Sequence, residues 1–214
     1  MASCCDRNGL SRVFNEKRSA ADARNYRRKG LDVDSRRIVD FLVARGIGGG
    51  TLLEIGGGVG AIQIELLRAG AVRAENVEIV PAYEAVARDL ASENGVADRI
   101  TRRVGDFAVD HADVPGADAV ILHRVVCCYP DMAGLVHPAA DRAGRWLVLT
   151  FPAARWWIRA GLRVMNGIQV LIHSSYCAYV HDPAAIDAIV RSSGVRPTVS
   201  RRGFIGELLA LERV

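Results

Sequence analysis

Hydrophobic residues are spaced along this chain in two alternating patterns. Short runs that are almost wholly apolar predict strands buried on both faces of a parallel sheet, and apolar residues every three or four positions predict amphipathic helices. The predicted strands cover 51–55, 76–80, 99–104, 118–123, 145–151, 195–201 and 204–212. The predicted helices cover 10–29, 35–45, 60–69, 81–95, 131–142, 155–172 and 183–192. This alternation predicts an α/β fold with helices on both faces of the sheet.

The C-terminal end of the chain departs from that alternation. Its last two predicted strands lie only a few residues apart, around Arg202 and Gly203. So short a connection permits only antiparallel pairing. We therefore expect a doubly wound sheet of seven strands that ends in a C-terminal antiparallel hairpin.

The N-terminal end is helical before the first strand begins. The helix over 10–29 stops at Gly30, and the next begins at Asp34 or Ser35, both good N-cap residues. This predicts an N-terminal helical cap over 1–34. The main domain would then cover 35–214.

The strongest chemical signal is the segment TLLEIGGGVG at 51–60. A buried strand runs through Glu54 into a glycine loop, and a predicted helix follows. This arrangement presents free backbone N–H groups to a nucleotide-like ligand, and glycines let the chain approach it closely. Gly56, Gly58 and Ala61 also satisfy the dinucleotide fingerprint, so the loop alone does not choose between cofactors.

Polar residues follow the other predicted parallel strands at the same edge of the sheet, where ligands of such folds bind. Glu78 lies near the end of the second strand, where a carboxylate accepts the two hydroxyl groups of a ribose. The third strand ends in Asp106 and Phe107, a carboxylate and a ring that suit an adenine, and the fourth ends at His123.

Composition narrows the function further. The 214 residues indicate one main domain, and the net charge of +4 comes almost entirely from scattered arginines, which makes a nucleic-acid partner unlikely. The chain has two lysines, Lys17 and Lys29, so no residue after Lys29 can be the lysine of a Schiff base, a Walker motif or a Tyr-x-x-x-Lys dehydrogenase. No secretory h-region and no bilayer-length apolar run is present, so we expect a cytoplasmic protein without a membrane partner.

The cysteines do not indicate a metal site. Two adjacent pairs, Cys4–Cys5 and Cys127–Cys128, differ from the C-x-x-C spacing of metal ligands, and adjacent cysteines rarely form a disulfide with each other. With His123 the second pair has a non-standard spacing for a soft metal. We expect no metal, and we expect Cys127 and Cys128 to be small core residues or part of a pocket rim.

Taken in order, these motifs resemble those of the class I S-adenosylmethionine-dependent methyltransferases. The matching segments are the glycine motif at 54–60, the second motif at 78–87 and Gly105-Asp106-Phe107. The second-motif acid is Glu78 where Asp is more usual. More narrowly, CCD near the start, NYRRKGLD at 25–32 and HRVVCCYPDM at 123–132 look like a group of small bacterial methyltransferases, loosely grouped with the magnesium-protoporphyrin methyltransferases.

The resemblance implies a Rossmann-like sheet and a set of cofactor contacts. Glycines would approach the methionine and ribose part, Glu54 would meet the amino end, Glu78 the ribose, and Asp106 with Phe107 the adenine. The implied S-adenosylmethionine contacts are Glu54, Gly56, Gly57, Gly58, Gly60, Glu78, Ile79, Asp106, Phe107 and His123.

The implied reaction is an in-line methyl transfer to a small-molecule acceptor. His123 and Tyr129 are the catalytic candidates, because the fourth strand ends at His123 and Tyr129 lies in the segment after it. Each residue also suits a structural role. Residues 153–181 are expected to cover the acceptor. The pocket candidates there are Trp156, Trp157, Met165, Tyr176 and Tyr179.

Two other functions stay open at the level of sequence. One is an NAD(P)-dependent oxidoreductase, although an acid at the Glu54 position is rare in such enzymes. The other is a non-catalytic relative of the methyltransferase fold that binds a partner through its basic N-terminal helix. There, Tyr26, Arg27 and Arg28 are equally suited to a lid over the cofactor.

Overall fold

The protein is built around one seven-stranded sheet. The computed structural model describes residues 7–172, 176–203 and 206–213. The strands are β1 Thr51–Ile55, β2 Arg73–Glu78, β3 Ile100–Val104, β4 Ala117–His123, β5 Ala143–Pro152, β6 Val195–Arg202 and β7 Gly206–Arg213. Their order across the sheet is β3-β2-β1-β4-β5-β7-β6, with β1 to β5 parallel and β7 antiparallel to both its neighbours. The predicted parallel sheet with a C-terminal hairpin is confirmed.

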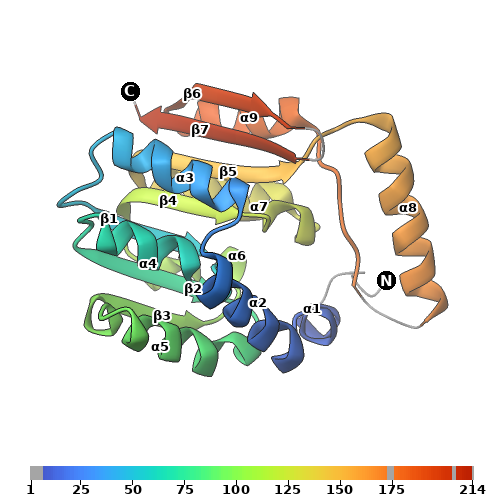
Figure 1. Ribbon diagram of the computed structural model, residues 1–214. Coiled ribbons are helices and arrows are strands. Elements are labelled where there is room, and N and C mark those ends of the chain that lie inside the picture. The colour runs from blue at the N-terminus through green and yellow to red at the C-terminus, as the bar shows by residue number, and fades with distance from the viewer. Residues whose placement is uncertain (1–6, 173–175, 204–205, 214) are drawn as a thin grey trace.

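Helices cover both faces of this sheet, as Figure 1 shows. They are α1 Arg7–Val13, α2 Glu16–Lys29, α3 Val33–Ala44, α4 Ala61–Arg68, α5 Glu84–Glu93, α6 Phe107–Asp110, α7 Met132–Arg142, α8 Trp156–Leu171 and α9 Pro183–Ser192. Short 3₁₀ turns occur at Pro81–Tyr83, Ala97–Arg99, His111–Asp113 and Val126–Cys128. The helices α3, α4 and α5 lie on one face, and α7 and α9 lie on the other.

Each face of the sheet has its own hydrophobic core, because successive side chains of a strand point to opposite sides. Leu52 and Ile121 belong to the core under α3 and α4, whereas Leu53 and Val120 belong to the core under α7 and α9. All four side chains are buried. Burial on both faces explains why β1 and β4 read as nearly continuous apolar runs in the sequence.

The predicted single helix over 10–29 is wrong. The chain breaks after α1, and Asn15 caps the start of α2 by accepting a hydrogen bond from the Arg18 backbone N–H. The predicted N-cap of α3 is also wrong, since Asp32 accepts from the backbone N–H groups of Asp34 and Ser35. In both cases a short polar side chain satisfies N–H groups that the helix leaves free.

The second strand lies earlier than predicted. It covers Arg73–Glu78 rather than 76–80, because its pairing with β1 begins at Thr51 opposite Arg73. Ile79 therefore follows the strand instead of lying within it. The prediction missed 73–75 because Arg73 and Glu75 interrupt the apolar pattern, although the Glu75 side chain is buried.

The N-terminal helices are held to the main domain by polar contacts. The Tyr26 hydroxyl donates to Glu65 of α4 at 3.0 Å, and the Arg27 guanidinium meets Glu93 of α5 at 2.7 Å. Leu10, Ala23 and Tyr26 also join the core under α3 and α4. The two helices thus pack at the carboxyl edge of the sheet, and their action as a lid over 1–34 stays a prediction.

Helix α8 differs from the other helices because it stands beside the layered body (Figure 1). Within α8 only Ile158 is buried. The Asn166 side chain joins the helix to the following segment, because its amide exchanges two hydrogen bonds with the Ala178 backbone. None of the helices in the described parts of the chain is both long and apolar enough to cross a bilayer.

Candidate active site

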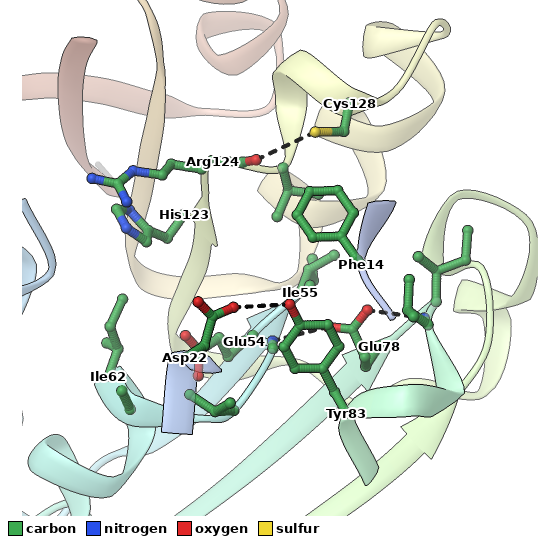
Figure 2. Close-up of a pocket in the computed structure, with 18 of the residues that line it drawn as sticks. Phe14, Asp22, Glu54, Ile55, Ile62, Glu78, Tyr83, His123, Arg124 and Cys128 are labelled. Atoms are coloured by element: carbon green, nitrogen blue, oxygen red, sulfur yellow. Dashed lines mark hydrogen bonds between the residues drawn. The ribbon is translucent and has the colours of Figure 1, made fainter. Parts of the chain in front are cut away.

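A cavity of about 610 Å³ opens at the carboxyl ends of β1, β2 and β4. Its floor is the glycine loop after β1. On another side lie Leu10 of α1, Phe14 of the break between α1 and α2, and Asp22 of α2. Figure 2 shows Glu54 and Glu78 on the floor, with His123 and Cys128 on other parts of the wall. The cavity gathers every residue of the predicted cofactor set except Gly60, the residue before α4.

The glycine loop leaves no space for side chains. Gly56, Gly58 and Gly60 have φ angles of +66°, +56° and +77°, in the left-handed region that favours glycine. A Cβ on Gly56 would lie 2.6 Å from Val125, and a Cβ on Gly57 would lie 2.2 Å from Asn76 Nδ2. Gly60 has no side chain to cap α4, and the backbone N–H of Gln63 in the first turn bonds to Glu54. The loop therefore lines the cavity with backbone rather than side chains, while the N–H groups of Gly56, Gly58 and Gly60 are bonded within the protein.

Glu78 holds the loop to the end of β2. One carboxylate oxygen accepts from the Gly58 backbone N–H and the other from the Val80 N–H, both at 2.9 Å. Burial raises the pKa of Glu78, and these two hydrogen bonds oppose the rise. Because a carboxylate has about four acceptor positions, it keeps capacity for two ligand hydroxyl groups.

Beneath the loop, three polar residues lie in a row across neighbouring strands. Glu54 of β1 pairs in register with Asn76 of β2, which pairs with Arg102 of β3. One oxygen of Glu54, both amide atoms of Asn76 and Nη1 of Arg102 are buried without a hydrogen-bond partner in the described structure. Buried polar atoms are normally satisfied, and of these three residues only Glu54 lines the cavity. A polar ligand group can therefore reach Glu54, whereas buried water would satisfy Asn76 and Arg102.

The carboxyl group of Glu54 has an unusual proton affinity. Burial raises its pKa to about 8, and the charge of Arg102 lowers it only in part. Glu54 is therefore mainly neutral at pH 7 until a cation enters the cavity beside it. A ligand ammonium group at this position would favour the ionised carboxylate.

Arg102 connects the polar row with the loop above it. Its Nε donates to Glu84 of α5 at 2.9 Å and its Nη2 donates to the Gly58 carbonyl at 3.1 Å. Its side chain is 5% exposed, so this ion pair is shielded from water. Arg102 thereby ties β3, α5 and the glycine loop together.

We expect Arg102→Met to lower the free energy of unfolding by about 3 kcal/mol, because it leaves the Glu84 carboxylate in a mostly buried position without its partner. The matched control is Arg103→Met on the same strand, whose partner is Glu75 but whose side chain is 45% exposed. It should cost no more than about 1 kcal/mol. Urea unfolding followed by circular dichroism measures both, and equal losses would contradict the assigned role of Arg102.

Asp106 begins the short helix α6 and faces Tyr129. One of its oxygens caps the helix by accepting from the Ala108 N–H, and the other accepts the Tyr129 hydroxyl, each at 3.1 Å. Burial, followed by the charge of Asp106, raises the pKa of Tyr129 to about 12. Phe107 is buried beside them and contributes to the cavity wall. Asp106 and Phe107 both line the cavity, and their role toward an adenine stays a prediction.

His123 is held between two hydroxyl groups. Its Nδ1 lies 2.8 Å from Thr150 Oγ1 and its Nε2 lies 3.3 Å from Ser35 Oγ. Burial, and then the charge of Arg124, lowers the pKa of His123 to about 4. Arg124 itself adopts a φ of +58° and pairs with Asp32 at 3.3 Å. His123 is therefore a neutral imidazole at pH 7, with both ring nitrogens occupied.

The side of the cavity away from the glycine loop is aromatic and sulfur-rich. The rings of Phe14 and Tyr176 meet edge to face with centroids 6.0 Å apart, and the Tyr176 hydroxyl lies 3.7 Å from Cys128 Sγ. Cys127 also lines the cavity, so the predicted pocket rim at the cysteine pair is confirmed. Cys4 and Cys5 lie outside the described residues.

The aromatic wall predicted between 153 and 181 is only partly present. Of its five candidates, Tyr176 alone lines the cavity among the described residues. Trp156 is 80% exposed on α8. Across the same described residues, no group of three or more His, Cys, Asp or Glu side chains has the placement to hold a metal ion.

The sequence did not single out Asn76, Arg102 or the contact of Asp22 with Tyr83. The Tyr83 hydroxyl donates to Asp22 at 3.0 Å, which joins α2 to the turn after β2 across the cavity (Figure 2). Asn76 carried one usable signal, since an amide within a buried strand normally has a ligand or a network to satisfy.

No family model matches the sequence. A ribosomal protein L11 methyltransferase from Enterobacter sp. (strain 638) is 31% identical over 107 residues, which is 50% of this chain and 31% of that protein. This chain therefore matches about a third of that relative's length.

Solved structures match over nearly the whole chain. The magnesium protoporphyrin IX methyltransferase from Synechocystis PCC 6803, solved with bound SAH, is 23% identical with a TM-score of 0.75, over 98% of this chain and 100% of that one. The chain has the methyltransferase fold. An O-methyltransferase family protein from Burkholderia thailandensis is 15% identical with a TM-score of 0.73. The match extends over 95% of this chain and 62% of that protein's chain. The resemblance predicted from the motifs is confirmed at the level of the methyltransferase fold.

Proposed function

We propose that the protein is an S-adenosylmethionine-dependent methyltransferase that acts on a small molecule. The observation that carries this proposal is the placement of Glu54, Glu78 and Asp106 at the ends of three neighbouring strands, around one glycine loop and one cavity. A sulfonium nucleoside offers an ammonium, a ribose and an adenine in the same order. The match is therefore chemical as well as geometric.

The residues present fit this cofactor at each of its parts. The glycine loop fits because Gly56, Gly57 and Gly58 line the cavity with backbone alone, and their close packing against Val125, Asn76 and Glu54 holds that backbone in place. The unpartnered oxygen of Glu54 suits the ammonium group. Glu78 would take the ribose hydroxyls, and Ile79 and Phe107 would give the adenine apolar surfaces beside the Asp106 carboxylate.

The bound cofactor would supply an activated methyl group, so the chain has little covalent chemistry to perform. Its task would be to hold the acceptor in line with the methyl and to exclude water. Phe14 and Tyr176 suit that task, because they close the side of the cavity away from the glycine loop. A cavity of about 610 Å³ for both ligands favours a small acceptor.

His123 and Tyr129 stay the catalytic candidates, and their surroundings favour positioning over proton transfer. Both side chains are neutral at pH 7, because the pKa of His123 is lowered to about 4 and that of Tyr129 is raised to about 12. A general base is needed only where the acceptor is protonated at working pH. We propose that Tyr129 orients Asp106 toward the adenine.

The test is calorimetric titration of the full chain with S-adenosylhomocysteine. We expect binding, and we expect Asp106→Asn to weaken it about 10-fold or more, because it removes a charged acceptor while an Asn still caps α6. Asp113→Asn, an exposed acid near α6, is the matched control and should bind normally. No heat with S-adenosylhomocysteine or S-adenosylmethionine, but heat with NAD, would replace this proposal with the oxidoreductase.

A further inference from the structure

Helix α8 presents a row of apolar side chains to solvent. Trp156, Val164 and Leu171 are 80%, 65% and 78% exposed, and Ile168 is 53% exposed. With 3.6 residues per turn, these four positions fall on one side of the helix. The opposite side, which contains Ile158, faces the body of the protein. The helix therefore has a second apolar face that nothing in the described structure covers.

Positive charge lies next to this outer face. Arg159 and Arg163 are exposed and occupy neighbouring positions on the helix surface. The whole stretch from 142 to 181 contains five arginines and no Asp or Glu. An apolar face with tryptophan beside a purely cationic flank is the pattern of a helix that lies in the surface of a bilayer.

The dimensions and the charge argue against other uses of this face. Sixteen residues of helix measure only about 24 Å, less than the roughly 30 Å of a hydrocarbon core. A second copy of α8 would bring arginines but no carboxylate to pair with them. Negatively charged lipid headgroups satisfy the arginines, and the acyl region accepts Trp156 and Leu171.

We propose that α8 docks on the surface of an anionic lipid bilayer, with its outer apolar face in the headgroup region and Arg159 and Arg163 at the phosphates. The contact is peripheral, and it differs from the membrane span that the sequence excluded. The inference does not depend on the cofactor, because it concerns a face outside the cavity. It runs against the expectation from the sequence that the protein has no membrane partner.

Flotation of the full chain with vesicles tests the apolar part of this contact. Vesicles of phosphatidylcholine with about one third phosphatidylglycerol should bind the protein, and pure phosphatidylcholine should bind it far less. The double variant Val164→Asp, Leu171→Asp should reduce binding at least about 10-fold. The control Val33→Asp changes a valine of similar exposure, 67%, at the start of α3, and should bind normally.

Charge reversal tests the electrostatic part. Arg159→Glu with Arg163→Glu should weaken binding to the anionic vesicles at least about 30-fold, since each cationic residue near such a surface adds about fivefold. Arg73→Glu with Arg196→Glu reverses two exposed arginines elsewhere and should have little effect. Calorimetry with S-adenosylhomocysteine on every variant keeps this result separate from the cofactor proposal.

Three results would overturn the docking proposal. They are equal binding to neutral and anionic vesicles, an absence of binding to both, and a dimer in analytical ultracentrifugation that Val164→Asp with Leu171→Asp separates. The last result would assign the face to a second copy of the chain.

Discussion

Gly57→Ala should destabilise the protein and abolish cofactor binding. The added methyl would lie 2.2 Å from Asn76 Nδ2 and 2.8 Å from the Glu54 carboxyl carbon, and neither side chain can move away because both are buried. Overpacking of this kind costs about 1–3 kcal/mol, and separating Glu54 from its neighbours adds to that loss. We expect the free energy of unfolding in urea to fall by about 3 kcal/mol and the calorimetric signal with S-adenosylhomocysteine to vanish.

The matched control is Gly48→Ala, in the loop before β1. A Cβ there meets nothing within 4 Å, and the residue is absent from the set with positive φ. Its stability should change by less than about 0.5 kcal/mol, with normal cofactor affinity. If Gly57→Ala behaved like this control, the glycine loop would not pack against the polar row as described.

Glu54→Gln should make the protein more stable and the cofactor site weaker. The unfolded carboxyl has an ordinary pKa near 4.5, whereas burial raises the folded value to about 8. Between these values the folded state binds more protons than the unfolded state, so this group lowers stability progressively as pH rises from 4.5 to 8. Glutamine has the same shape and no charge, so it should add up to about 3 kcal/mol at pH 7.

The pH dependence separates this explanation from a general change in packing. The stability difference between Glu54→Gln and the unchanged protein should grow with pH up to about 8, as urea unfolding at several pH values would show. Affinity for S-adenosylhomocysteine should rise from pH 6 to 7.5 only where Glu54 is present, because the ammonium group requires the carboxylate. Glu75→Gln, which loses an ion pair with Arg103, is the control and should gain no stability. A difference that did not change with pH would contradict the raised pKa.

Much of the fold was predictable because local patterns determine it. Because β1 and β4 are buried on both faces of the sheet, their sequences are mainly apolar. Asp182 and Pro183 are a typical pair of residues for the start of a helix, and α9 begins there. The predicted site residues meet because parallel strands place their carboxyl ends at one edge of the sheet. The role of each residue toward a ligand stays a prediction.

The remaining features depend on contacts between distant parts of the chain. Asn76 stands between Glu54 and Arg102 only through the register of three strands, which no short segment specifies. The break before α2 depends on one capping side chain, Asn15, inside a pattern that otherwise suits a continuous helix. The exposed face of α8 has the same residue types as a core helix, so only the packed structure shows which side is covered.

The unsatisfied polar row under the glycine loop has a consequence for how such a protein would evolve in the laboratory. If Glu54 and its neighbour Asn76 reserve hydrogen-bonding capacity for a ligand, then neutral replacements of these two residues improve folding at the expense of recognition, whereas Arg102 stays necessary for its ion pair with Glu84. Screens that reward expression or heat resistance would enrich inactive sequences at these positions. Screens that reward ligand binding would enrich variants of low stability. The two kinds of screen would therefore rank the same variants in opposite orders.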